Sequence, residues 1–155
     1  MCIRDRGLTA RQLQPATPTY TVETLAMRDT GDIIDLYQYY PDNFFEPAQL
    51  ATGHYYGVRQ QGRLVAVAGV HVFAPSSGVA CLGNIVTHPE FRGRGLSTAC
   101  TSHLCQQLVA QGVEVLALNV DQHNTAATRV YEKLGFRHNN TYLEGMLHAL
   151  SGIAS

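Results

Sequence analysis

The sequence predicts a mixed α/β fold, with a central sheet covered by helices, on three observations. Apolar runs of strand length joined by short turns precede residue 90, which indicates an antiparallel meander. Apolar residues then recur at helical spacing, and a further strand and a second amphipathic helix follow. A meander followed by a strand–helix–strand unit implies a mixed sheet. With 155 residues, 45% of them apolar, we expect one domain over residues 19–155.

The N-terminal segment lacks the pattern of a regular element. Residues 1–18 carry charges together with Gly7, Pro15 and Pro18 and have no sustained apolar period, so we expect a poorly ordered leader. The opening MCIRDR is similar to the start of fragmentary reading frames, which leaves open a missing upstream segment. Residues 20–27 alternate and are rich in β-branched side chains, so they predict a first strand.

The middle of the chain predicts a helix followed by a hairpin. Apolar residues at helical spacing indicate a helix over residues 29–40, which Pro41 ends, and a short helix is expected over residues 47–52. Two apolar runs flank a Gln-Gln-Gly turn. They predict long antiparallel strands over residues 54–59 and 63–74.

The next three elements are a strand, a helix and a strand. Residues 79–87 predict the first strand, and the helix after it has a buried face that repeats every four residues. That face consists of Leu96, Cys100, Leu104 and Leu108. Gly112 ends the helix as a C-cap. Residues 113–120 are almost continuously apolar, which fits a strand buried on both faces and parallel to its predecessor.

One more helix and the tail complete the fold. Asn124 is a favourable N-cap for a helix with Ala127 and Tyr131 on its apolar face, and Gly135 ends it. The tail from Phe136 onward has room for one or two strands.

Composition restricts the class of partner. The formal net charge is -1 and the pI is about 6.6, so no basic field favours nucleic acid or an anionic membrane, and a small molecule is the better default. No apolar run approaches the roughly 20 residues that cross a bilayer, and no secretion signal is visible, so we expect a cytoplasmic protein.

Cysteine and histidine residues do not form a recognised metal pattern. The cysteines are Cys2, Cys81, Cys100 and Cys105; none forms a C-x-x-C pair, and we expect reduced, inward-facing thiols. The histidines His88, His103, His123 and His138 are read as solvated or capping residues. We therefore expect neither a metal nor a nucleophilic thiol.

A Gly-rich segment between a strand and a helix predicts an anion site. It consists of Arg92, Gly93, Arg94, Gly95, Leu96 and Ser97. Unpaired N–H groups of a helix start bind anions, and glycine lets the backbone approach phosphate oxygens closely. A dinucleotide fingerprint is disfavoured, since Thr98 replaces its third small residue and four strands precede the loop. A Walker loop is excluded because no Gly-Lys-Ser/Thr occurs.

Residues 79–136 resemble the core of the GNAT acyltransferases. The family's R-x-x-G-x-G/A is matched by Arg92, Gly95 and Ser97, with Ser97 as a small departure. Its V-x-x-x-N-x-x-A-x-x-x-Y-x-K-x-G-F motif is matched by Val120, Asn124, Ala127, Tyr131, Lys133, Gly135 and Phe136. The resemblance implies a GNAT-like acyl-CoA N-acyltransferase fold. Its mixed, mostly antiparallel sheet would have two parallel central strands, ending at Thr87 and Val120, that splay apart.

The resemblance also implies acetyl-CoA as cosubstrate. The segment from Arg92 to Ser97, including Gly93, Arg94, Gly95 and Leu96, would bind the pyrophosphate. The backbone of Ile85, Val86 and Thr87 would pair with the pantetheine arm like an added strand. Asn124 would bond to the arm, and Tyr131 would lie near the thioester sulfur.

Acetyl transfer to an amine needs a polarised carbonyl, a proton for the leaving thiolate and a neutral amine. A backbone N–H near Val86 is a candidate for the first role and Tyr131 for the second. The candidate bases are Glu46, His71 and Glu144. We select Glu144, which the resemblance places near the tail strands that flank the acceptor groove in relatives. A lone histidine on a strand is more often a core side chain. Asn84 could instead position a water. With inward-facing cysteines, direct transfer is favoured over a covalent intermediate.

The expected activity is transfer of an acetyl group to a primary amine of a small molecule or peptide. An aromatic group suggests a partly apolar acceptor; it consists of Tyr37, Tyr39, Tyr40, Phe44 and Phe45. A homodimer is left open. The alternative function is a non-catalytic module that binds acyl-CoA as a sensor or regulator.

Overall fold

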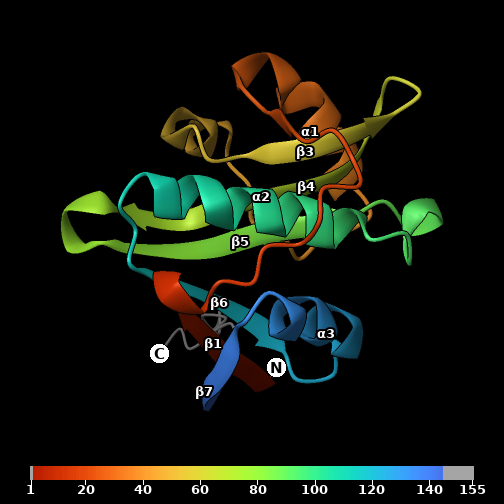
Figure 1. Ribbon diagram of the computed structural model, residues 1–155. Helices are drawn as coiled ribbons and strands as arrows, with labels where there is room; N and C mark the ends of the chain where they lie inside the picture. Colours follow the sequence, from red (N-terminus) through yellow and green to blue (C-terminus); the bar gives the residue numbers. More distant parts are fainter. Residues whose placement is uncertain (1, 145–155) are drawn as a thin grey trace, which may run out of the picture.

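The computed structural model describes residues 2–144, which form a seven-stranded sheet in the order β2-β3-β4-β5-β6-β1-β7 (Figure 1). The strands are β1 (Cys2–Thr9), β2 (Glu23–Thr24), β3 (Tyr56–Gln60), β4 (Arg63–Ala74), β5 (Val79–Thr87), β6 (Val115–Asp121) and β7 (Arg137–Leu143). Strands β5 and β6 are parallel, and every other neighbouring pair is antiparallel. The predicted mixed, mostly antiparallel sheet is confirmed.

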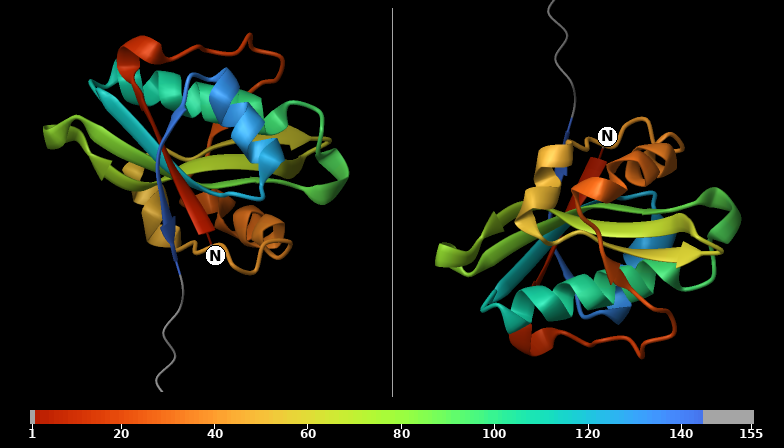
Figure 2. Two further views of the ribbon diagram at one scale, coloured as in Figure 1. Left: turned by 90° about the horizontal axis from the view of Figure 1, so that it is seen from below. Right: turned by 90° about the horizontal axis from the view of Figure 1, so that it is seen from above.

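Helices cover both faces of this sheet. The α-helices are α1 (Thr30–Tyr37), α2 (Leu96–Ala110) and α3 (Thr125–Lys133). The short 3-10 helices are η1 (Ala10–Gln12), η2 (Met27–Asp29), η3 (Pro47–Thr52), η4 (Pro75–Ser77) and η5 (Pro89–Phe91). Figure 2 shows α2 and α3 on one face and α1 and η3 on the other. The predicted four-residue repeat of α2 is buried in the core beneath it, and α1 buries Ile33 and Leu36 in a second core.

The prediction of a poorly ordered leader over residues 1–18 is wrong. Cys2–Thr9 is strand β1, which lies between β6 and β7 and pairs with both. Ile3 and Leu8 are buried in it, but Arg6 is also buried, with 2% of its surface exposed and its guanidinium 3.2 Å from a carboxylate oxygen of Glu132. The ion pair with Glu132 of α3 offsets the free-energy cost of removing the Arg6 charge from water. Because the charges hid the apolar alternation, the strand was not visible in the sequence.

The predicted strand over residues 20–27 is much shorter than expected. Only Glu23–Thr24 pairs with β3, as strand β2. The segment before it crosses α2, where the backbone N–H of Ala16 donates to Ser102 Oγ at 2.9 Å. Only the two residues of β2 therefore join the sheet edge, while the chain before them runs beside α2.

The other predicted elements are confirmed with small shifts of their ends, except that β6, which was expected to be buried on both faces, is buried on one face only. The hairpin is β3 and β4, residues 79–87 are β5, and residues 47–52 are η3. The tail contains β7, and the part of the tail prediction beyond residue 144 lies outside the described residues.

Strands β5 and β6 separate towards their carboxyl ends. Within residues 2–144 they pair over Val79–Leu82 and Val115–Leu118 and no further, so the predicted splay is present. A bulge in β5 begins where the pairing ends, and in it Asn84 adopts a φ of 52°. β-bulges bend a strand and occur beside active sites, which fits an opening at this place.

Candidate functional site

A cleft of about 410 Å³ lies at the splay between β5 and β6. From the face that carries α2 and α3 it is lined by Ser97, Asn124, Ala127 and Tyr131, which we name the helix side. The second set, which we name the loop side, consists of Asp42, Asn43, Phe44, His71, Asn119 and Glu144. The splayed edge of β5 lies between the two sets.

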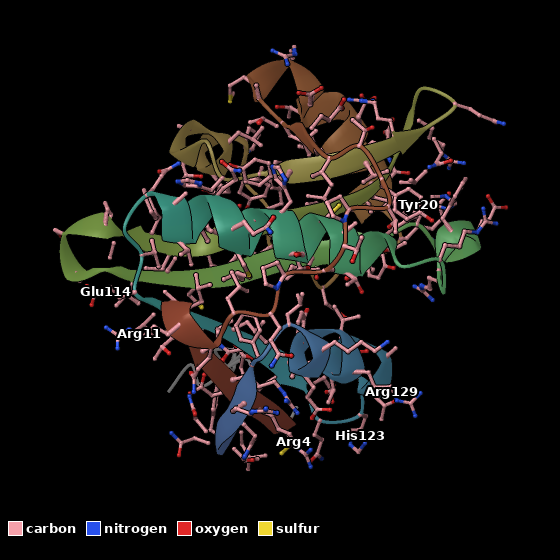
Figure 3. The ribbon with its side chains drawn as sticks, viewed as in Figure 1. Arg4, Arg11, Tyr20, Glu114, His123 and Arg129 are labelled. Carbon is pink, nitrogen blue, oxygen red and sulfur yellow. The ribbon has the colours of Figure 1, made fainter. Side chains whose placement is uncertain are left out.

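The start of α2 presents free backbone donors beside this cleft. Gly93 and Gly95 adopt φ angles of 74° and 80°, which favour glycine, and there is open space where a Cβ would be. Gly95 is the N-cap and no side chain caps the helix. The Tyr20 hydroxyl donates to the Arg94 carbonyl at 2.8 Å, and Figure 3 shows Tyr20 near this end of α2 with Arg11 at the other. Uncapped N–H groups at a helix start suit a diphosphate.

The two arginines of the loop are held by aromatic rings. The Arg92 guanidinium donates to Tyr40 Oη at 2.8 Å and lies 5.5 Å from the centre of that ring. The Arg94 guanidinium lies 4.9 Å from the ring centre of Phe91. Both side chains add positive charge where the helix dipole already favours an anion.

The edge of β5 that faces the gap belongs to Ile85 and Thr87. The backbone N–H of His88 donates to Val65 of β4 at 2.8 Å, and successive peptide groups of a strand face opposite edges. The peptide groups of Val86 therefore face β4 as well, whereas those of its two neighbours face the gap. This alternation corrects the inclusion of Val86 among the pantetheine-binding positions. The Tyr40 hydroxyl donates to the Thr87 carbonyl.

Helix α3 places Tyr131 in the cleft. Asn124 caps the helix, with its Oδ1 accepting from the Ala127 N–H at 3.1 Å, as predicted. Tyr131 is 6% exposed, and burial, with a smaller contribution from the Cys105 thiol, raises its pKa well above the usual value near 10. The phenol therefore stays protonated throughout the neutral range and can donate a proton.

A model of the acetyltransferase (GNAT) family matches residues 17–136. The chain belongs to this family. It is 38% identical over 77 residues to [ribosomal protein bS18]-alanine N-acetyltransferase of Escherichia coli K12, an alignment that covers 50% of each chain. The chain thus spans about half the length of the curated relatives it matches.

Solved structures of the family share its fold. A protein from Novosphingobium aromaticivorans that is assigned to the GNAT family superposes with a TM-score of 0.74 and 28% identity, over 90% of this chain and 61% of that one. The structure of the ribosomal-protein-S18-alanine N-acetyltransferase of Escherichia coli gives a TM-score of 0.62 and 27% identity, over 74% and 76%. The predicted GNAT-like fold is therefore confirmed.

The three candidate bases of this family member occupy different places. His71 and Glu144 line the cleft, whereas Glu46 precedes η3 and is not among the residues that line it. The expectation that His71 is a core side chain is wrong, because the residue is exposed. Asn84 also lines the cleft, but its Nδ2 donates to Tyr55 Oη at 2.9 Å, so its amide nitrogen already has a buried partner.

Of the predicted aromatic group, Phe44 alone among the residues described lines the cleft, and 67% of its surface is exposed. Tyr37 is buried and donates to the Asn84 carbonyl at 2.8 Å. Tyr39 lies against His88 in a separate hollow. The cleft is therefore lined by one ring of this group in place of five.

Sequence reasoning missed Asp42, Asn43 and Asn119 as cleft residues. Asn119 is a polar residue inside the apolar run of β6, and that interruption could have identified it. The other two lie in the loop after α1, where no local pattern marks their position.

The thiols behave mainly as packing groups. Burial raises the pKa of Cys100 and Cys105 to about 12. Cys81 departs from the prediction because it is half-buried and lines the cleft, although burial raises the pKa of its thiol too.

His88 is a capping residue, which was one of its two predicted roles. It is buried, and its side chain caps η5 by accepting from the Glu90 N–H at 3.2 Å. Residues 2–144 contain no group of His, Cys, Asp or Glu arranged to hold a metal.

No helix in the described part of the chain is long and apolar enough to cross a bilayer.

Proposed function

We propose that this chain is an N-acetyltransferase that transfers the acetyl group of acetyl-CoA to a primary amine by direct attack in a ternary complex. The observation that carries the proposal is the buried phenol of Tyr131 in a cleft between the two unpaired strand edges. A thioester lying along such an edge would reach a proton donor without a covalent enzyme intermediate. Membership of the GNAT family supports the same reaction.

The helix side would hold the coenzyme. The uncapped amides of Leu96 and Ser97, the glycines Gly93 and Gly95 and the two loop arginines would bind the pyrophosphate. The peptide groups of Ile85 and Thr87 would bond to the pantetheine arm as an added strand. Thr87 can do so with its N–H while its carbonyl accepts from Tyr40.

The chemistry divides between two groups. The N–H of Ile85 or Thr87, at the gap-facing edge, would polarise the acetyl carbonyl and stabilise the oxyanion that forms on attack. The Tyr131 hydroxyl would give its proton to the departing thiolate of coenzyme A. Asn124 would serve mainly by fixing the start of α3, because its carboxamide oxygen caps the helix.

The loop side would receive the acceptor. Its carboxylates, Asp42 and Glu144, suit an amine that arrives as an ammonium ion, and Phe44 offers an exposed ring to an apolar part of the substrate. The acceptor would be a small molecule or a peptide; the relative named for the alanine of ribosomal protein bS18 favours testing peptide amines first. A cytoplasmic location and a homodimer remain predictions.

The test is a panel of amines, including peptides with free α-amino groups, assayed by release of free thiol from acetyl-CoA. Reactions without amine measure hydrolysis, and calorimetry measures coenzyme binding separately. We expect amine-dependent thiol release from at least one class. Binding of acetyl-CoA without thiol release from any amine would instead support the non-catalytic acyl-CoA-binding module.

A further inference from the structure

We propose that His71 is the base that removes the proton from the acceptor amine, a role that rests on the proposed function. It displaces Glu144 as the preferred base and leaves that carboxylate to bind the ammonium form. Three features support the proposal: the position of His71 in the ladder, the surface on which its ring rests and the groups around it.

His71 is the extra residue of a bulge between β4 and β5. Val70 pairs with Leu82 and Val72 pairs with Cys81, so His71 has no partner in the ladder. A bulged residue no longer follows the alternation of its strand, and its side chain can be aimed at a neighbouring site. Here that site is the cleft, which the side chain lines although β4 is not one of the two splayed strands.

Gly83 provides the surface for the imidazole ring. A Cβ at residue 83 would overlap with Cε1, Nδ1 and Nε2 of His71, so the ring rests directly on the glycine. Residue 83 is also the first of β5 beyond its pairing with β6, where the gap begins. Leu82 belongs to the core under α2, and neighbouring side chains alternate, so Gly83 and the ring lie on the loop side.

The groups around His71 suit an acceptor that arrives as an ammonium ion. On the loop side the ring shares the cleft with the carboxylates of Asp42 and Glu144, and Asp121 of β6 also lines the cleft. No Lys or Arg is among the residues that line it. Carboxylates attract an ammonium ion but are weak bases at neutral pH, while imidazole as a class accepts protons in this range. An amine bound between these groups would have both a counter-ion and a base.

The proton balance is complete without another reactant. His71 takes one proton from the ammonium ion, and the neutral amine attacks the acetyl carbon, forming the C–N bond. The C–S bond breaks as the tetrahedral adduct collapses, and the thiolate takes the Tyr131 proton. The second proton of the attacking nitrogen returns to the Tyr131 oxygen by way of solvent, and His71 releases its proton to solvent. The products are the N-acetyl amine, coenzyme A as thiol and one proton.

The experiment compares His71→Gln with His138→Gln, a matched change at an exposed histidine of β7 that is not among the residues lining the cleft. With an amine that the wild type acetylates, we expect the first variant to lose about 100-fold in kcat/KM, as removal of a general base does. Its acetyl-CoA affinity should stay within about twofold of the wild-type value, since His71 is not part of the pyrophosphate loop. The control should match the wild type.

Two further readouts separate a base from a structural residue. The acid limb of the wild-type pH–rate profile should disappear in His71→Gln, and added imidazole should restore part of the activity of His71→Ala by occupying the space over Gly83. Wild-type rates in His71→Gln, or a slow variant with an unchanged acid limb and no imidazole rescue, would overturn the inference. A wild type inactive on every amine would instead refute the proposed function.

Discussion

The two sides of the cleft differ in how the chain builds them. The helix side comes from one stretch, residues 97–131, and the strand edge next to it from residues 85–87. The loop side combines the loop after α1 with β4, β6 and the end of the described chain. Groups from one short stretch keep a fixed spacing that a motif can encode. Groups from four separate stretches meet only after folding.

The two sides also differ in the atoms that they offer. The helix side and the adjoining β5 edge present backbone N–H groups, which any residue other than proline would provide in the right backbone conformation. The loop side presents side chains, among them an imidazole, two carboxylates and an exposed phenyl ring. We therefore expect loss of coenzyme affinity from changes on the helix side, and loss of amine selectivity from changes on the loop side.

The largest effect should come from Tyr131→Phe. Tyr131 lies on the helix side, but we expect it to act in the chemical step and not in coenzyme binding, so this variant is an exception to the division between the two sides. We expect turnover to fall about 100-fold or more, since general-acid catalysis is lost. Acetyl-CoA affinity by calorimetry should change little, and Tyr39→Phe, away from the cleft, should behave as wild type.

The same residue also determines a pH dependence. Because burial raises the pKa of Tyr131, its hydroxyl loses a proton only above the usual phenol range. The wild-type rate should therefore show no alkaline fall from this group below about pH 10. Turnover of Tyr131→Phe equal to that of the wild type, under conditions where chemistry limits the rate, would remove the acid from the mechanism.

Coenzyme binding without an amine should stabilise the fold, which would separate the helix side, where the coenzyme is proposed to bind, from the loop side. Acetyl-CoA at about 100 times its Kd should add roughly 2.7 kcal/mol to the free energy of unfolding. That corresponds to a Tm increase of roughly 5–10 °C for a domain of this size. Thermal denaturation with and without acetyl-CoA measures this increase in Tm. A Tm that does not change at any acetyl-CoA concentration would contradict the coenzyme site.

Arg94→Glu should weaken coenzyme binding by about tenfold, because a charge-assisted contact to the diphosphate is replaced by repulsion in an exposed position. Arg11→Glu is the matched control, since Figure 3 shows Arg11 at the other end of α2. Calorimetry should place the control at the wild-type Kd and the loss should shrink as salt is added. Equal Kd values for the two variants would exclude Arg94 from the anion site.

The smallest effect concerns the support of the loop side. Tyr55→Phe removes one of the two acceptors of the Asn84 amide, the other being Gln49 Oε1 at 3.3 Å, and so weakens the hydrogen bonds that support the bulge of β5. We expect a loss of about 1 kcal/mol in urea unfolding, the usual net contribution of such a bond. The amine KM should rise more than the acetyl-CoA KM; the reverse order would show that this network serves the helix side.

Where prediction failed, long-range partners were responsible. Strand β1 escaped notice because Arg6 is buried by pairing with Glu132, a residue far along the chain. His71 was taken for a core side chain because strand alternation does not predict a bulge, and the bulge depends on the register of β4 against β5. The aromatic residues from the end of α1 onward were grouped by proximity in sequence. The hydroxyls of Tyr37 and Tyr40, however, donate to β5 carbonyls, and Phe44 lines the cleft.

The sequence by itself determined the mixed sheet, the order of most elements, the glycine loop at the start of α2 and the spacing from Asn124 to Tyr131. These depend on local backbone preferences and on periodicity, which neighbouring residues fix. The tertiary structure alone decided the central place of β1, the depth of burial of Tyr131 and the meeting of His71, Asp42 and Glu144 in one cleft. Those features require pairing between distant segments, and no local pattern encodes the register of such a pairing.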